Sequence, residues 1–169
     1  GRLIEGFEYA TKDAFLTTRG RVLGGAASYT AERDNTTTKE GKASLKLHFE
    51  PQARGSWGYT EIFLEQVQDI SGDRAISVWV HGDGSGQHIK ILLIDEDRER
   101  WHDEEIPVAF KGWKRIVFGV KGLARDPFDG VTNGDSRPNP DKLAGFAFAM
   151  RANHNKPATV FVDGVTAHP

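Results

Sequence analysis

Apolar and polar side chains alternate along most of this chain, which is the pattern of a β-strand with one buried face. In Ala75–His81, for example, Ile76, Val78 and Val80 alternate with polar or aromatic residues. Alternation of this kind buries one face of a strand and turns the other face outward. The same reasoning predicts strands over Leu3–Glu8, Ala14–Leu23, Ala27–Arg33, Ala43–Phe49, Trp57–Leu64, Ala75–His81, His88–Asp95, Arg100–Ile106, Trp113–Phe118, Phe146–Arg151 and Thr159–Thr166.

Glycine-rich turns separate the predicted strands, as at Gly24-Gly25, Glu40-Gly41 and Gly82–Gly86. No segment keeps a helical period over several turns. Many short strands with regular turn signals predict an all-β fold, a sandwich or barrel of antiparallel strands. The one long irregular stretch is Lys121–Asp141, which is rich in Gly, Pro, Asn and Asp. A loop of that length in a compact domain is usually functional.

The bulk composition fits one globular domain that spans residues 1–169. A formal net charge of -2 and the lack of a basic stripe argue against a nucleic-acid partner. No apolar run reaches the ~18 residues that cross a bilayer, so no membrane partner is expected. The absence of cysteine excludes disulfides, thiol nucleophiles and Cys-ligated zinc. Because the chain starts at Gly1 without a signal peptide, we expect a mature or excised segment.

Motifs along nearly the whole chain resemble one family of carbohydrate-binding modules. The opening Leu3–Glu8 resembles the start of modules with a galactose-binding-like jelly roll. Further motifs resemble family 11 of these modules, which binds β-glucans: Trp57-Gly58, Asp97-Arg98-Glu99-Arg100-Trp101, Gly112-Trp113-Lys114-Arg115-Ile116 and Val160-Phe161-Val162-Asp163-Gly164-Val165. The resemblance implies an antiparallel two-sheet β-sandwich (a jelly roll) whose first and last strands lie side by side. Ser56 and Met150 depart from the family, which has Tyr at both of these sugar-facing positions.

Sugars are bound by aromatic rings that stack on a pyranose face and by planar polar groups that hydrogen-bond neighbouring hydroxyls. Trp57, Tyr59 and Glu61 share one face of a predicted strand, and Trp79 lies opposite an apolar set. This chemistry, together with the resemblance, selects the following candidate carbohydrate-binding residues: Trp57, Tyr59, Trp79, Asp97, Trp101, Arg125, Asp126, Phe128, Arg151 and His154.

Several candidates also have a purely structural interpretation. Trp57 could belong to the core, because large aromatic side chains are mostly buried. Trp79 could be covered by the long loop. Asp97 could belong to a solvated acidic turn, and His154 could be an ordinary surface histidine.

The resemblance further implies one structural calcium ion near the first and last strands. Ca²⁺ prefers six to eight hard oxygen ligands from carboxylates and carbonyls. Glu8, Glu40, the carbonyl of Lys42 and Asp163 could supply them. The alternative is that Glu8 and Asp163 are exposed acids at strand ends.

Three functions are compatible with these observations. The favoured one is a non-catalytic module that binds a β-glucan-like polysaccharide in a groove on the concave sheet. It would target the catalytic domain of a larger glycoside hydrolase and would be secreted or cell-surface. A related β-sandwich occurs in a complex I assembly factor. The second candidate is therefore a β-sandwich that binds a protein partner. A jelly-roll lyase or glycosidase is the third. Asp95, Asp97 and Glu99 could supply the two carboxylates that a glycosidase needs, but the Glu-x-Asp-x-x-Glu signature of jelly-roll glucanases is absent there and the segment fits a hairpin tip better. We therefore expect no enzymatic activity.

Overall fold

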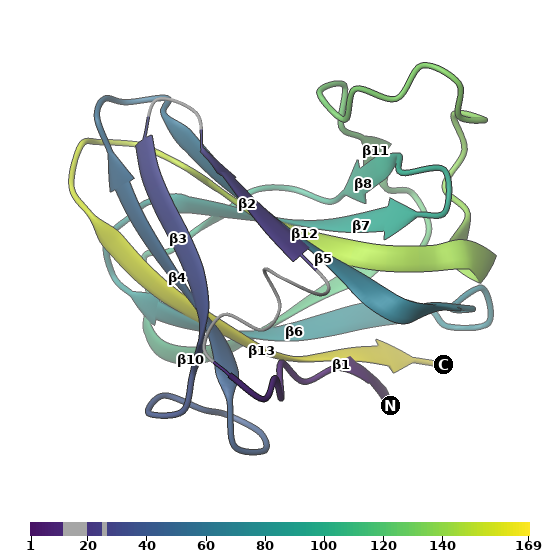
Figure 1. Ribbon diagram of the computed structural model, residues 1–169, viewed down its shortest axis with the longest axis horizontal. Coiled ribbons are helices and arrows are strands. Elements are labelled where there is room, and N and C mark those ends of the chain that lie inside the picture. Colours follow the sequence, from purple (N-terminus) through teal and green to yellow (C-terminus); the bar gives the residue numbers. More distant parts are fainter. Residues whose placement is uncertain (12–19, 25–26) are drawn as a thin grey trace.

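The computed structural model describes residues 1–11, 20–24 and 27–169, and its strands form two antiparallel sheets packed face to face (Figure 1). Sheet A consists of β10 (Lys111–Gly119), β6 (Ala75–Asp83), β13 (Ala158–His168), β4 (Ser44–Pro51) and β3 (Ala27–Asp34), with β1 (Arg2–Glu5) also paired to β13. Sheet B consists of β11 (Ala124–Arg125), β8 (Arg100–His102), β7 (His88–Asp95), β12 (Leu143–Arg151), β5 (Trp57–Gln68) and β2 (Gly20–Gly24), with β9 (Ile106–Pro107) also paired to β7. One 3-10 turn (Pro140–Lys142) precedes β12. The predicted two-sheet jelly-roll sandwich is confirmed.

The first and last described strands lie side by side, as predicted. Strand β1 runs antiparallel to β13, with Arg2 opposite Ala167 and Leu3 opposite Thr166. Strand β1 ends earlier than predicted, at Glu5. The chain turns at Phe7, which has a left-handed φ of 57° and a fully buried side chain. Glu8 therefore lies beyond the strand.

The predicted strand Arg100–Ile106 is interrupted, and both of its halves pair with β7. Leu92 lies opposite His102, whereas Ile89 lies opposite Ile106. The pairing therefore shifts by one residue between the halves, which is the signature of a β-bulge. Bulges re-aim the side chains next to them, and this one turns residues 103–105 out of the regular alternation. The start of the predicted strand Ala14–Leu23 lies outside the described residues, and its end is β2.

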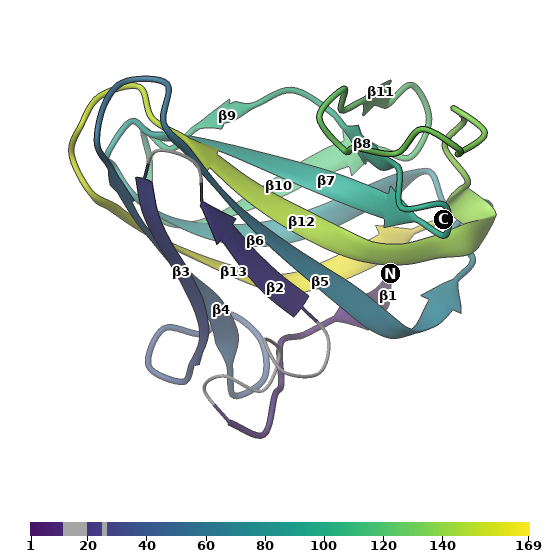
Figure 2. The same cartoon turned by 45° about the horizontal axis from the view of Figure 1, so that its top comes forward.

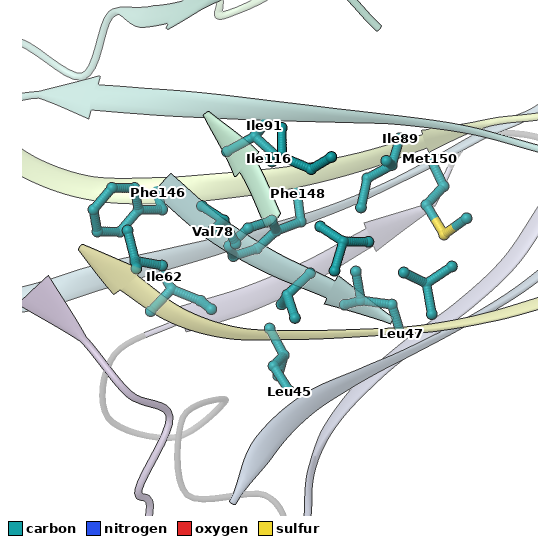
Figure 3. Close-up of a cluster of buried hydrophobic side chains, with 14 of the residues drawn as sticks. Leu45, Leu47, Ile62, Val78, Ile89, Ile91, Ile116, Phe146, Phe148 and Met150 are labelled. Atoms are coloured by element: carbon teal, nitrogen blue, oxygen red, sulfur yellow. The ribbon is translucent and has the colours of Figure 1, made fainter. Parts of the chain in front are cut away.

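The core lies between the inner faces of the two sheets (Figure 3). Strand β4 contributes Leu45 and Leu47, and strand β12 contributes Phe146, Phe148 and Met150, all without solvent exposure. The period-two pattern of the sequence therefore identified the buried faces correctly. Burial of apolar area on this scale is the main force that holds such a sandwich together.

No helix in the described ranges has the length and apolar character needed to cross a membrane. The loop that follows β10 includes the short strand β11 and lies over one end of sheet B, as Figure 2 shows. This loop forms one border of the candidate site.

Candidate functional site

The outer face of sheet B carries a groove of about 520 Å³. The groove crosses four neighbouring strands, from β5 over β12 and β7 to β8, and reaches the loop that follows β11. Its lining consists of Trp57, Tyr59, His88, Lys90, Leu92, Arg100, Glu105, Asp126, Phe128, Ala149, Met150 and Arg151.

Strand register explains why these side chains meet. Arg151 in the central strand lies opposite both Trp57 and His88, and Ala149 lies opposite both Tyr59 and Lys90. Residues at positions i and i+2 of a strand share a face, so both rows point outward. Ala149 is small between two long neighbours, and the sheet surface is hollowed at this position.

A charged network occupies the Arg151 row of the groove. Arg151 Nε lies 3.0 Å from both carboxylate oxygens of Glu105, and its Nη2 lies 2.7 Å from Glu105 Oε2. His88 Nδ1 lies 3.1 Å from Glu105 Oε2, and Lys90 Nζ lies 3.9 Å from Oε1. The hydrogen bonds from Arg151, together with the contact to His88 and the positive charges of Arg151 and Lys90, lower the pKa of Glu105 to about 2. A fixed guanidinium–carboxylate pair offers donors and acceptors in one plane, which suits neighbouring hydroxyl groups.

Glu105 is expected to remain ionised well into the acid range. Its pKa lies below the ordinary value of 4.5, so the pairing contributes fully above pH 4.5 and is lost as the pH falls through about 2. In an NMR titration of the side-chain carboxyl, we expect a midpoint near 2 in the unmodified protein. Arg151→Met should move the midpoint toward 4.5, because the first cause of the depression is removed. A midpoint near 4.5 in the unmodified protein would show that the pair does not form in solution.

Two aromatic side chains stand exposed on opposite borders of the groove. Trp57, at the start of β5, is 47% exposed, and Phe128, in the long loop, is 85% exposed. Tyr59 is buried instead and forms part of the floor. Its hydroxyl donates to Glu61 Oε1 over 2.8 Å, and the guanidinium carbon of Arg100 lies 4.4 Å from its ring centroid. Burial raises the pKa of Tyr59, so the phenol stays a donor at any physiological pH.

Arg100 also attaches the long loop to the sheet. Its backbone carbonyl accepts the Asp126 N–H over 2.8 Å, and its Nη2 donates to the Phe128 carbonyl over 3.2 Å. Asp126 Oδ2 lies 3.8 Å from Arg100 Nη1. These contacts bring Asp126 and Phe128 to the groove.

The structure places five of the predicted carbohydrate-binding residues in the groove: Trp57, Tyr59, Asp126, Phe128 and Arg151. It places the predicted candidates Trp79 and Trp101 elsewhere. Trp79 does face outward, but β6 belongs to sheet A, and its Nε1 donates to Glu40 Oε1 over 3.1 Å. Trp101 is 6% exposed, and its Nε1 donates to the buried Asp95 over 3.0 Å.

The remaining predicted residues also lie outside the groove lining. Asp97 is exposed in the turn between β7 and β8, 3.4 Å from the amide nitrogen of Asn139. His154 packs against the Ser85–Gln87 segment, and its Nε2 lies 2.5 Å from the Ser85 carbonyl oxygen. Arg125 is directed into the long loop, where it binds Asp129. These three side chains contact other groups of the protein and do not line the groove.

Seven residues of the groove lining were not among the predicted candidates: His88, Lys90, Leu92, Arg100, Glu105, Ala149 and Met150. His88 and Lys90 alternate with buried isoleucines in β7, so this signal was present. Glu105 gives no such signal, because the bulge alone directs it into the groove.

The two positions that depart from the family contribute no ring to this face. Ser56 is buried, and its hydroxyl accepts the Ala53 N–H over 3.2 Å. Met150 is fully buried in the core cluster. Exposed aromatic surface in this groove therefore comes from Trp57 and Phe128.

The predicted calcium residues surround the turn between β3 and β4. Asp163 is fully buried, its Oδ2 accepts the N–H groups of Lys39 and Glu40, and its Oδ1 has no hydrogen-bond partner among the described residues. Burial raises the pKa of Asp163, and the charge of Glu40 raises it further. A Cβ at Gly164 would lie 2.7 Å from Glu40 Oε2, so the space beside these carboxylates depends on this glycine. A buried carboxylate with one oxygen unsatisfied fits a hard cation.

Of the other two predicted calcium residues, Glu8 is less available to a cation. Glu8 Oε1 already accepts the N–H groups of Lys42 and Ala43, over 2.8 and 3.2 Å. Glu8, Glu40 and Asp163 do not form a close carboxylate group. Among the described residues, Asp97, Glu99 and Asp135 form the group of that kind, with carboxylate oxygens within 4.8 Å of one another. Arg125 forms an ion pair with Glu99 of that group. The Ser136 N–H donates a hydrogen bond to Glu99, and the side-chain amide of Asn139 donates to Asp97 and Asp135.

Exposed rings beside a planar charged pair on an open sheet face are the chemistry expected of a carbohydrate-binding module. The sequence matches the carbohydrate binding domain of family 11 over residues 1–167, and the chain belongs to that family. The domain is therefore a non-catalytic carbohydrate-binding domain. A search of curated protein sequences finds no match.

Solved structures show the same fold at low sequence identity. The family 11 module of the cellulosomal cellulase Lic26A-Cel5E of Clostridium thermocellum superposes with a TM-score of 0.68 and 16% identity, over 99% of this chain and 93% of that chain. A family 11 module from Clostridium thermocellum in complex with a β-1,3-1,4-mixed-linked tetrasaccharide gives a TM-score of 0.69 and 15% identity, over 99% and 94%. A β-1,2-glucanase from Parabacteroides distasonis gives a TM-score of 0.66 and 13% identity, over 100% of this chain and 26% of that chain.

Proposed function

We propose that this domain binds a β-glucan-like polysaccharide chain in the groove on sheet B and targets an attached glycoside hydrolase to that polymer. The observation that carries the proposal is the pair of exposed rings, Trp57 and Phe128, on the two borders of one groove. Between them lies the planar pair of Arg151 and Glu105. Rings for stacking and a planar pair for hydroxyls are the two devices that sugar recognition needs.

The extent of the groove favours a chain over a single sugar. Four adjacent strands about 4.8 Å apart place its two borders roughly 14 Å from each other. A ligand that contacts both Trp57 and Phe128 must therefore be longer than one pyranose ring. Each sugar contact replaces a contact with water, so the affinity should be modest and should grow with chain length.

Several comparisons support the glucan and the attached enzyme. One family 11 module was solved with a mixed-linkage β-glucan tetrasaccharide. The fold also covers about a quarter of larger chains, namely 26% of a β-1,2-glucanase and 25% of an exo-β-agarase. Linking a binding module to a catalytic domain raises the local concentration of the enzyme at the polymer. Because such polymers are too large to enter cells, the protein would act as a secreted or cell-surface molecule.

Native gel electrophoresis in embedded polysaccharide tests this function. We expect retardation in mixed-linkage β-glucan, without release of reducing ends, and little retardation in xylan, mannan, alginate or agarose. Glucan oligosaccharides should bind more tightly as they lengthen until both rings are covered. Retardation only in another polymer would overturn the β-glucan assignment. Normal mobility in every gel would instead favour the protein-interaction alternative.

Calcium is part of the proposed function, as a structural ion at Asp163. The free Oδ1 of Asp163 and the neighbouring carboxylate of Glu40 would hold it, and the ion would neutralise a buried charge. The site lies between strand β13 and the turn that connects β3 to β4, away from the groove. The ion would therefore stabilise the fold and take no part in sugar contact.

Removal of calcium is expected to lower the melting temperature. At free calcium 100-fold above its Kd, the ion should add about 2.7 kcal/mol, or roughly 5–10 °C in Tm. Asp163→Asn should abolish this response, since it removes the anchoring charge. In EDTA the same variant should melt no lower than the unmodified protein, because a buried carboxylate with a raised pKa is costly without a cation. The exposed variant Asp141→Asn is the control, and equal Tm values with calcium and with EDTA would disprove the ion.

A further inference from the structure

The loop that carries Phe128 is organised around the guanidinium group of Arg125. Its Nε and Nη2 bind the two carboxylate oxygens of Asp129 over 3.0 and 3.2 Å. Nη2 also donates to the Val131 carbonyl over 2.8 Å, and Nη1 donates to the Ser136 hydroxyl over 2.9 Å. One side chain therefore connects both limbs of the loop.

The same guanidinium ties the loop to sheet B. Arg125 Nη1 lies 2.9 Å from Glu99 Oε2, and the Glu99 side chain, just before β8, is 0% exposed. Glu99 Oε1 accepts the N–H of Ser136 over 2.9 Å. The Asp129 side chain is only 2% exposed and also accepts the N–H groups of Arg100 and Val131. We call Arg125, Glu99 and Asp129 the loop clamp.

The clamp lies beside the groove and not in it, because none of its three residues belongs to the groove lining. Phe128 is adjacent to Asp129 in sequence, lines the groove and is 85% exposed. An apolar ring with that exposure has no packing of its own to keep it in place. Its position over the groove follows from its backbone, which Arg100 holds at the Phe128 carbonyl and the clamp holds at the neighbouring Asp129.

We propose that Arg125 is a positioning residue for polysaccharide binding, which acts by holding Phe128 over the groove before the ligand arrives. This inference rests on the proposed function. Preorganisation of a contact residue improves affinity, because the ordering cost is met before binding. Lysine cannot replace Arg125 here, because it lacks the planar fork that binds both oxygens of Asp129 and also reaches Glu99 and Ser136.

A double-mutant cycle between Arg125 and Phe128 tests the proposal. We expect Phe128→Ala and Arg125→Lys each to weaken binding of a mixed-linkage β-glucan oligosaccharide roughly tenfold. The double variant should bind within about twofold of Phe128→Ala alone, because the clamp acts through the ring. Asp129→Asn removes one partner at similar shape and should repeat the effect of Arg125→Lys. The exposed Arg137→Lys, in the same loop, should bind as the unmodified protein does.

Amide hydrogen exchange without ligand tests the clamp separately. The N–H groups of Val131 and Ser136 bind Asp129 and Glu99, so their exchange should accelerate at least about tenfold in Arg125→Lys. Core amides of β12 should be unaffected, which shows that the domain stays folded. Additive losses in the cycle, or full affinity of Arg125→Lys, would overturn this inference alone. Failure of the unmodified protein to bind any glucan would overturn the proposed function and this inference with it.

Discussion

Trp57→Ala is expected to weaken polysaccharide binding by about thirtyfold or more, which corresponds to roughly 2 kcal/mol. Trp57 is 47% exposed at the border of the groove, next to Arg151 in the pairing of β5 and β12. Its indole is the larger of the two exposed ring systems on the groove borders, and its loss removes a stacking contact without emptying the core. Isothermal titration calorimetry with a β-glucan oligosaccharide measures the change.

Trp79→Ala is the matched control for this prediction. Trp79 also faces solvent from a strand, but it lies on sheet A, away from the groove. We expect it to bind with unchanged affinity, after a thermal melt has shown that both variants fold. Equal losses in both variants, or a loss in Trp79→Ala alone, would show that the ligand does not occupy the groove on sheet B.

Phe148→Ala is expected to lower the free energy of unfolding by about 3–5 kcal/mol. Phe148 is fully buried in β12, and its ring meets that of Phe7 edge to face at a centroid distance of 6.0 Å. Truncation leaves a cavity between the two sheets that the neighbouring strands cannot close. Urea unfolding followed by tryptophan fluorescence measures the loss.

Val117→Ala supplies the comparison, because Val117 is 56% exposed on β10. Its effect on unfolding should stay within about 0.5 kcal/mol. A loss below about 1 kcal/mol for Phe148→Ala would mean that β12 does not form the centre of the core.

Much of the fold could be read from the sequence, because the period of two decides which face of each strand is buried. It assigned the core faces of β4, β6 and β12 correctly, and it placed Trp57 and Tyr59 on one face. It also placed Trp79 opposite an apolar set, which is true of the structure. Alternation does not indicate which of the two sheets a strand belongs to. The strand that carries Trp79, β6, belongs to sheet A, whereas the groove lies on sheet B.

The groove itself was only half predictable, because the missing part depends on long-range pairing. Glu105 lines the groove because the register of pairing with β7 shifts by one residue between β8 and β9. No local sequence pattern predicts such a shift. Trp101 belongs to a motif that matches the family, yet its indole is buried against Asp95. Arg125 shows the same limit, because its several partners come together only when the loop folds.

The pairing of β1 with β13 has a practical consequence for engineering. Arg2 lies opposite Ala167, so the two ends of the chain leave the sandwich at one place. A short peptide could therefore join them, and new ends could be cut into an exposed turn to give a circular permutant. Cargo fused at residue 1 or at residue 169 would leave from the same end of the sandwich, and a permutant would let it be moved nearer to or farther from the bound polymer.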